Sequence, residues 1–207
     1  MSRRSAALLL AGAYVALAVL FAVGAFRRLD QWAVDELMPG SEFRHVESGL
    51  ADSIVPLRHL RWDNGWAIAV NLVTLPAALV ISVGLAAILS RRLAVVLLVA
   101  VAVEVLCKTV IDGPALFHNG SHIAAFDSSF PSGHALRTVI LAGAVAVAVP
   151  RFRALAVAWA VASIVLLELA GWHTPTDLAG GVVLGLLALL GARGAGALRG
   201  RRLLARG

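Results

Sequence analysis

Residues 130–150 read FPSGHALRTVILAGAVAVAVP, a short polar motif followed by a long apolar run. A helix that crosses a membrane needs about 20 apolar residues, because a rise of about 1.5 Å per residue must cover about 30 Å of hydrocarbon. Five other stretches have the same character. The sequence therefore predicts six transmembrane helices, over residues 6–26, 66–89, 93–112, 132–150, 154–172 and 174–192.

The composition of the whole chain agrees with a membrane protein. Of its 207 residues, 60% are hydrophobic and 14% are charged, whereas soluble domains are nearer half apolar and a quarter charged. This excludes an ordinary cytosolic enzyme, a disordered chain and a coiled coil. The single cysteine, Cys107, excludes an intrachain disulfide and a cysteine-based metal cluster.

We therefore expect an all-α, polytopic membrane protein with one domain over residues 1–207. Arg3 and Arg4 before the first apolar stretch also fit a signal peptide, but the run is long and no clear cleavage site follows, which favours an uncleaved anchor. The expected parts are an anchor helix over 6–26, an outer loop over 27–65, a helical core over 66–192 and a basic tail over 193–207.

The arginines predict the orientation of the helices. With the N-terminus in the cytoplasm, the inner segments hold 11 of the 17 arginines and no acidic residue or histidine, as positively charged inner loops require. The net charge of +6 then reflects topology and attraction to anionic lipid head groups rather than nucleic-acid binding. Both termini are expected in the cytoplasm. The Ala-, Leu- and Arg-rich usage, with Lys108 as the one lysine, favours a bacterial inner (plasma) membrane.

The outer loop over 27–65 is long and carries seven of the twelve acidic residues. Apolar residues recur in it at helical spacing, which predicts an amphipathic helix lying on the outer surface. Such a helix either guides a lipid towards a site or only stabilises the interface. The residues that define it are Phe43, Val46, Leu50, Ile54, Leu57 and Leu60.

Seven ionisable residues fall within or at the outer ends of the apolar stretches. Each costs roughly 2.5–3.5 kcal/mol to insert, so each needs a partner or a task. In the predicted topology they all lie in the outer half of the membrane, which indicates a common site. Glu104 and Lys108 share one helix face and also fit a mutually satisfied ion pair. The seven are Glu104, Lys108, His134, Arg137, Glu168, His173 and Asp177.

The motif Pro131-Ser132-Gly133-His134 stands at the start of one predicted helix. Free amide groups and the helix dipole make such a start a favourable seat for a phosphate. Ser132 adds a hydroxyl, Gly133 lets an anion approach the backbone, and His134 is placed to donate a proton.

A second motif, residues 171–177, stands at the start of the last predicted helix. Asp177 can reach His173, where a carboxylate would fix the tautomer of the ring and raise the nucleophilicity of the other nitrogen. Alternatively, Asp177 is the acidic residue of a capping box that begins at Thr174. These parts together predict phosphoryl transfer, with a lysine, an anion seat, one histidine as nucleophile and another as acid.

No metal or cofactor is expected, because no carboxylate cluster suited to Mg²⁺ stands beside these residues. His118 and His122 in the loop before the Pro-Ser-Gly-His motif fit surface groups better than metal ligands. Arg137, three residues after His134, shares a helix face with it and could grip two phosphoryl oxygens. The alternative for Arg137 is a structural pair with Glu104 or Glu168.

These motifs resemble the type 2 phosphatidic acid phosphatase family of membrane lipid phosphate phosphatases. The middle block of that family is complete here at residues 131–134, and the third block matches in its histidine and aspartate, His173 and Asp177. The chain departs from the pattern at two arginines. Leucines at 166 and 167 replace the Ser-Arg of the third block, and the Arg-Pro of the first block falls on Ala115 and Leu116.

The resemblance implies roles for the site residues. His173 would attack phosphorus and form a phosphohistidine, His134 would protonate the leaving oxygen, and Asp177 would hold His173. The phosphoryl oxygens would be bound by Lys108, Ser132 and the Gly133 amide. A polyprenyl or phosphatidyl phosphate or diphosphate is the expected substrate, bound at the outer face among membrane lipids. The alternatives are a phosphotransferase with the same intermediate, or a non-catalytic protein that binds lipid phosphates.

Reporter fusions test the predicted orientation. A fusion at Arg92 should report a cytoplasmic position, and one at Gly120 an outside position, because the arginines flank the inner ends of the helices. Fluorescent-protein and alkaline-phosphatase reporters distinguish the two sides. An outside signal at Arg92 would overturn the six-helix topology.

Overall fold

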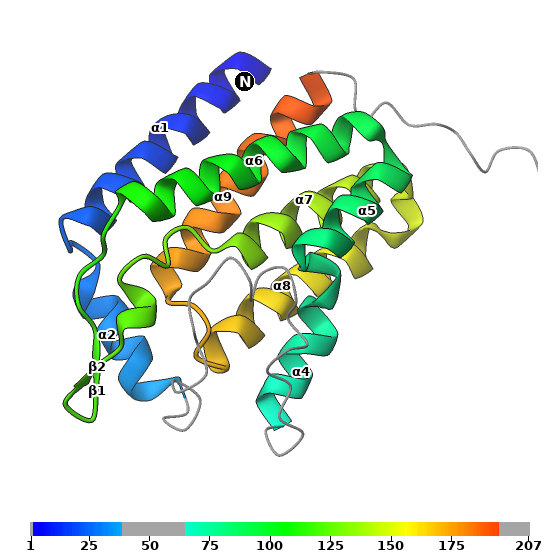
Figure 1. The fold of residues 1–207 in the computed structure, drawn as a ribbon. Helices are drawn as coiled ribbons and strands as arrows, with labels where there is room; N and C mark the ends of the chain where they lie inside the picture. Colours follow the sequence, from blue (N-terminus) through cyan, green and yellow to red (C-terminus); the bar gives the residue numbers. More distant parts are fainter. Residues whose placement is uncertain (1, 39–64, 195–207) are drawn as a thin grey trace, which may run out of the picture.

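The computed structural model describes residues 2–38 and 65–194, which are mostly helical (Figure 1). A two-stranded antiparallel hairpin and short 3-10 turns connect the helices. The predicted amphipathic helix around residues 43–60 lies outside the described residues. In chain order the elements are α1 (Arg3–Ala22), α2 (Arg27–Glu36), α4 (Gly65–Thr74), η2 (Leu75–Ala77), α5 (Leu79–Leu89), α6 (Arg91–Val110), β1 (Phe117–His118), β2 (Ser121–His122), η3 (Ala124–Phe126), α7 (Gly133–Ala148), η4 (Pro150–Phe152), α8 (Arg153–Leu169) and α9 (Pro175–Gly194).

Four helical stretches in the described part of the chain are long and apolar enough to cross a membrane. They are Arg4–Ala22, Arg91–Val110, Pro150–Leu169 and Pro175–Gly194. A fifth crossing is possible if the bent pair formed by α4, η2 and α5 counts as one. Helix α7 has 16 residues, fewer than the about 20 that a crossing requires. The chain is thus a helical protein suited to a membrane, and the count of six crossings stays a prediction.

Residues 27–36 form a short helix that the sequence analysis assigned only to the outer loop. Helix α1 ends at Ala22, and Gly24 adopts a positive φ of 71° that turns the chain into α2. One face of α2 is buried through Asp30, Ala33 and Val34, and the opposite face is charged.

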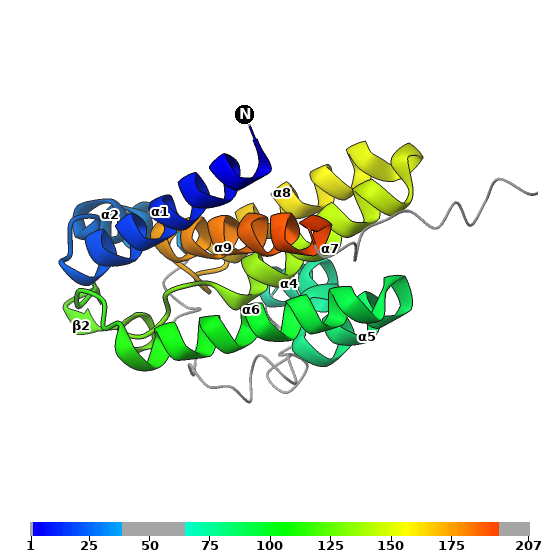
Figure 2. The same ribbon diagram turned by 90° about the horizontal axis from the view of Figure 1, so that it is seen from above.

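Helix α7 lies at the centre of the bundle and contacts α5, α6, α8 and α9 (Figures 1 and 2). Its apolar residues Leu136, Ile140 and Ala144 are fully buried. The aromatic ring of Phe130, just before α7, stacks on Phe21 of α1 with centroids 4.8 Å apart. This packing holds the start of α7 inside the protein.

The bend between α4 and α5 measures 41° and coincides with Pro76, which has no N–H group to donate. Backbone carbonyls beside the bend accept hydrogen bonds from side chains of other helices. Trp159 Nε1 donates to the carbonyl of Val73 at 2.8 Å, and Arg137 Nε donates to that of Ala77 at 2.5 Å. Carbonyls left free in a membrane would be costly, so these bonds stabilise the bend.

Glycines on α9 allow α7 to approach very closely. A Cβ atom at Gly181 would overlap the carbonyl oxygen of Ser132, and one at Gly185 would lie 2.9 Å from Val139. Only hydrogen at these positions permits such contact. The two helices therefore pack closely against each other at the end where both polar motifs lie.

Gly181→Ala should destabilise the protein, because an added methyl group would push α7 from α9 at a cost of about 1–3 kcal/mol. The measurement is the melting temperature of the detergent-purified protein. Gly191→Ala on the same helix is the matched control, because nothing lies within 4 Å of an added Cβ there. Equal melting temperatures for the two variants would contradict this account of the helix contact.

Candidate active site

The Pro-Ser-Gly-His motif forms the start of α7 as the sequence analysis expected. Ser132 is the N-cap, and its Oγ accepts a hydrogen bond from the Ala135 amide at 3.3 Å. The Ser132 amide donates to the backbone carbonyl of Asp177 at 2.9 Å. One backbone hydrogen bond thus joins the two polar motifs.

The second motif follows the end of α8. Gly171, at a φ of 72°, ends that helix and reverses the chain direction. His173 then lies beside His134, with ring centroids 6.0 Å apart. The ring of Trp172 packs edge-on against His134, with centroids 5.6 Å apart. Both histidines are buried. Neither Nε2 of His134 nor Nδ1 of His173 has a hydrogen-bond partner among the described residues, although Nδ1 of His173 faces the carboxylate of Asp177.

Asp177 performs the capping role and also lies near the histidine. Its Oδ2 accepts from the Thr174 amide at 3.2 Å, and its own amide donates to Thr174 Oγ1 at 3.4 Å, which is a capping box. The same Oδ2 lies 3.8 Å from His173 Nδ1, an ion-pair distance that is too long for a hydrogen bond. Both alternatives from the sequence analysis therefore fit the geometry.

Burial favours the neutral form of His173. It lowers the pKa of this imidazole below its ordinary value of 6.5, and the nearby Asp177 carboxylate acts in the opposite direction. A neutral ring keeps a lone pair on nitrogen, which a nucleophile requires.

Three charged side chains meet beside this pair of histidines. Glu104 Oε1 lies 3.1 Å from Lys108 Nζ, and its Oε2 lies 3.2 Å from Arg137 Nη1. Glu104 and Arg137 are fully buried, whereas the Lys108 side chain is 27% exposed. The structural pairing considered for Arg137 is therefore present. Its Nη2, however, has no partner among the described residues.

Other candidates from the sequence lie outside this cluster. The Glu168 side chain forms no ion pair or hydrogen bond with another described residue and is only half-buried. His118 and His122 lie in the hairpin, where His122 Nε2 lies 2.8 Å from Asp127 Oδ1. No group of three histidine, cysteine or acidic residues in the described part could hold a metal ion.

Asp30 supports the site, although the sequence did not indicate this role. From α2 it caps the start of α9, since its Oδ1 accepts from the Thr176 amide at 3.1 Å and from Thr176 Oγ1 at 2.8 Å. Burial raises the pKa of Asp30 from 3.8 to about 6, with Asp177 adding to the shift and the Thr176 hydrogen bonds opposing it. In the sequence Asp30 lies in a charged segment that is typical of a solvated loop, so no sequence pattern predicted that it would be buried.

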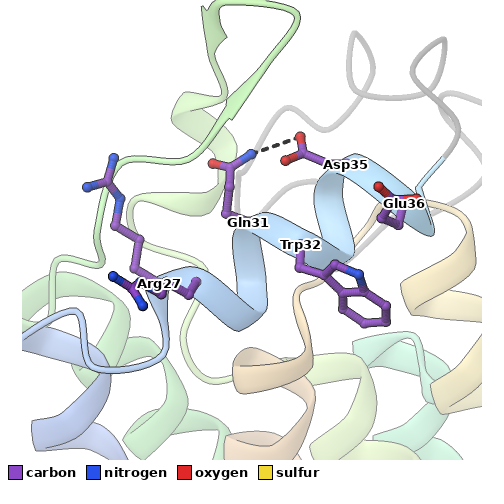
Figure 3. Close-up of a pocket in the computed structure, with 6 residues that line it drawn as sticks. Arg27, Gln31, Trp32, Asp35 and Glu36 are labelled. Carbon is purple, nitrogen blue, oxygen red and sulfur yellow. Dashed lines mark hydrogen bonds between the residues drawn. The ribbon is translucent and has the colours of Figure 1, made fainter.

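The opposite face of α2 holds a depression of about 380 Å³ (Figure 3). Its lining contains neither histidine of the cluster. Gln31 Nε2 donates to Asp35 Oδ1 across it at 3.0 Å, and Trp32 is exposed. This charged surface with one tryptophan is typical of a helix at a membrane interface. The lining residues are Arg27, Arg28, Gln31, Trp32, Asp35 and Glu36.

The model of the PAP2 superfamily matches residues 89–196. The matched region contains α6 to α9 and so includes both histidines, Ser132, Asp177 and the charged cluster. The chain belongs to the PAP2 superfamily. Members of this superfamily are phosphatases that act on phosphate esters, which agrees with two buried histidines beside paired cations. No curated protein and no solved structure matches the chain.

Asp30→Asn should make the stability of this PAP2 protein less dependent on pH. Asp30 keeps its proton up to about pH 6 in the folded state and ionises near pH 3.8 when unfolded. The folded state binds the extra proton, so the stabilisation is complete at low pH and is lost as the pH rises through 6. The loss should be on the order of 2–3 kcal/mol at most.

Melting temperatures in detergent between pH 4 and 7.5 measure this effect. The wild type should lose stability relative to Asp30→Asn as the pH rises, since the amide retains the acceptor for Thr176 without a charge. Asp35→Asn, at an exposed position of the same helix, should follow the wild type. Parallel curves for the wild type and Asp30→Asn would refute the buried-carboxyl interpretation.

Proposed function

We propose that the protein hydrolyses a lipid phosphate or diphosphate, of polyprenyl or phosphatidyl type, through a phosphohistidine at the outer face of the bacterial inner membrane. The observation that carries this proposal is the pair of buried imidazoles, 6.0 Å apart, at the adjoining starts of α7 and α9. Lys108 and Arg137 are the cations nearest to the place where a phosphate would enter, between the two imidazoles.

In the proposed first step, a nitrogen of His173 forms a bond to phosphorus while the bond to the leaving oxygen breaks. His134 gives its proton to that oxygen. Asp177 keeps His173 in place from the capping turn, and Lys108, Arg137, Ser132 and the Gly133 amide stabilise the charge on the phosphoryl oxygens. In the second step, water attacks phosphorus and loses a proton to His134 as the P–N bond breaks, which releases phosphate.

The apolar surface of the helices supports a lipid substrate. Large apolar side chains on α1, α5, α6 and α8 are exposed in the monomer, as expected where helices face lipid. The arginines expected at the inner ends of the helices support a position of the histidine cluster on the outer side. A substrate anchored in the outer leaflet would then reach the cluster without leaving the membrane.

His173→Ala should abolish release of phosphate from every substrate, because the phosphoryl group has no other nucleophile. His134→Ala should keep part of its activity on an aryl phosphate, whose leaving group departs without a proton, and lose activity on alkyl and lipid phosphates. The measurement is phosphate release by the purified protein from a panel of lipid and aryl phosphates.

His122→Ala is a matched control, since its ring lies in the hairpin and pairs with Asp127. It should behave as the wild type. Trapping of a phosphorylated protein that is labile to acid and absent from His173→Ala would support the intermediate. Full activity of His173→Ala would overturn the mechanism, and tight lipid phosphate binding without turnover would favour a non-catalytic role.

A further inference from the structure

The carboxylate of Glu104 lies beside Gly133, next to the place where the sequence predicts a phosphate. A Cβ atom added to Gly133, the first residue of α7, would overlap this carboxylate. Glu104 also contacts Lys108 and Arg137, the two cations expected to bind phosphoryl oxygens. An anion from the protein itself therefore occupies the start of α7 and engages both cations.

This arrangement limits the charge that the site can neutralise. Two cations and one carboxylate leave a single net positive charge beside Gly133. Asp177 on α9 lies 3.8 Å from His173 and forms no ion pair with Lys108 or Arg137 in the described part of the chain, so it stands outside this count. The structure shows no other cation in contact with Glu104 within the described ranges. The positive ends of α7 and α9 contribute only partial charges.

Both cations, Arg137 and Lys108, can still form hydrogen bonds to a ligand. Arg137 is 1% exposed and its Nη2 has no partner in the described part of the chain. Lys108 is the most exposed member of the cluster, so its ammonium can move from Glu104 to a ligand. A phosphate could thus share both cations with Glu104 but could not replace the buried carboxylate without leaving it unpaired, which is costly.

We infer that Glu104 makes this site selective for a phosphate group with a single negative charge. Such a group is either a phosphodiester or the singly ionised form of a monoester. A single charge balances the net positive charge of the cluster, whereas a doubly charged phosphate leaves an uncompensated anion beside Glu104 in a buried site. The inference rests on the proposed function, because it takes the Gly133 region as the phosphate site, and within that function it disfavours a diphosphate, which carries at least two charges.

Ligand binding tests the inference without requiring turnover. Calorimetry at pH 8.5 compares inorganic phosphate, which carries two charges, with diethyl phosphate, which carries one. Glu104→Gln should bind inorganic phosphate about tenfold more tightly than the wild type, and the gain for diethyl phosphate should be smaller. Glu168→Gln, an equally conservative change without an ion pair, should leave both affinities unchanged.

The wild type alone also provides a test, should Glu104→Gln fail to fold. It should bind diethyl phosphate at least as tightly as inorganic phosphate, despite the smaller charge. Inorganic phosphate binding more than about tenfold tighter than diethyl phosphate, or Glu104→Gln affinities equal to those of the wild type, would overturn the inference.

Turnover separates the two sources of a singly charged phosphate. Wild-type protein is given 4-nitrophenyl phosphate and its bis-ester from pH 5 to 8.5. Hydrolysis of the bis-ester at pH 8.5 supports a phosphodiester. Monoester hydrolysis that declines with rising pH, as the ester becomes doubly charged, supports the singly ionised monoester. Undiminished monoester hydrolysis at pH 8.5 without bis-ester hydrolysis contradicts the inference. Absence of any turnover defeats the proposed function, while the binding comparison still decides the role of Glu104.

Discussion

The candidate site depends on the close contact between α7 and α9. The Ser132 amide donates to the Asp177 carbonyl, and Gly181 provides the space for that approach. Because His134 follows Ser132 by two residues and His173 precedes Asp177 by four, this one contact fixes both imidazoles. The geometry of the candidate site is therefore a property of backbone packing, which determines where the side chains lie.

Electrostatic balance is the second requirement of such a site. A buried arginine in a lipid-facing protein needs compensation, and Arg137 obtains it from Glu104 and from the carbonyl exposed at the bend between α4 and α5. Ala115 and Leu167 stand where the resemblance to phosphatidic acid phosphatases implies two further arginines. The smaller number of cations and the internal carboxylate keep the buried charges nearly balanced, because extra positive charge would have no counter-ion in the absence of substrate.

The sequence predicted most of the helical architecture and the residues that meet, for local reasons. Apolar length, the Pro-Ser-Gly start and the spacing of His173 and Asp177 are readable from neighbouring residues. The cap from Asp30 depends on a contact between distant segments, and so do the hydrogen bonds by which α7 and α8 stabilise the bend at Pro76. Arg137 shows the limit best, since its helix position was readable but its sharing between Glu104 and Ala77 required the fold.

The cap from Asp30 has a consequence for how the chain is organised. Helix α2 lies before the region that matches the superfamily model, yet its carboxyl group completes the start of α9 across 146 residues of sequence. The N-terminal helices are consequently not an interchangeable anchor attached to an autonomous catalytic module. A chimera that exchanged residues 1–38 for another membrane anchor would remove the cap that Asp30 provides at the start of α9, close to His173.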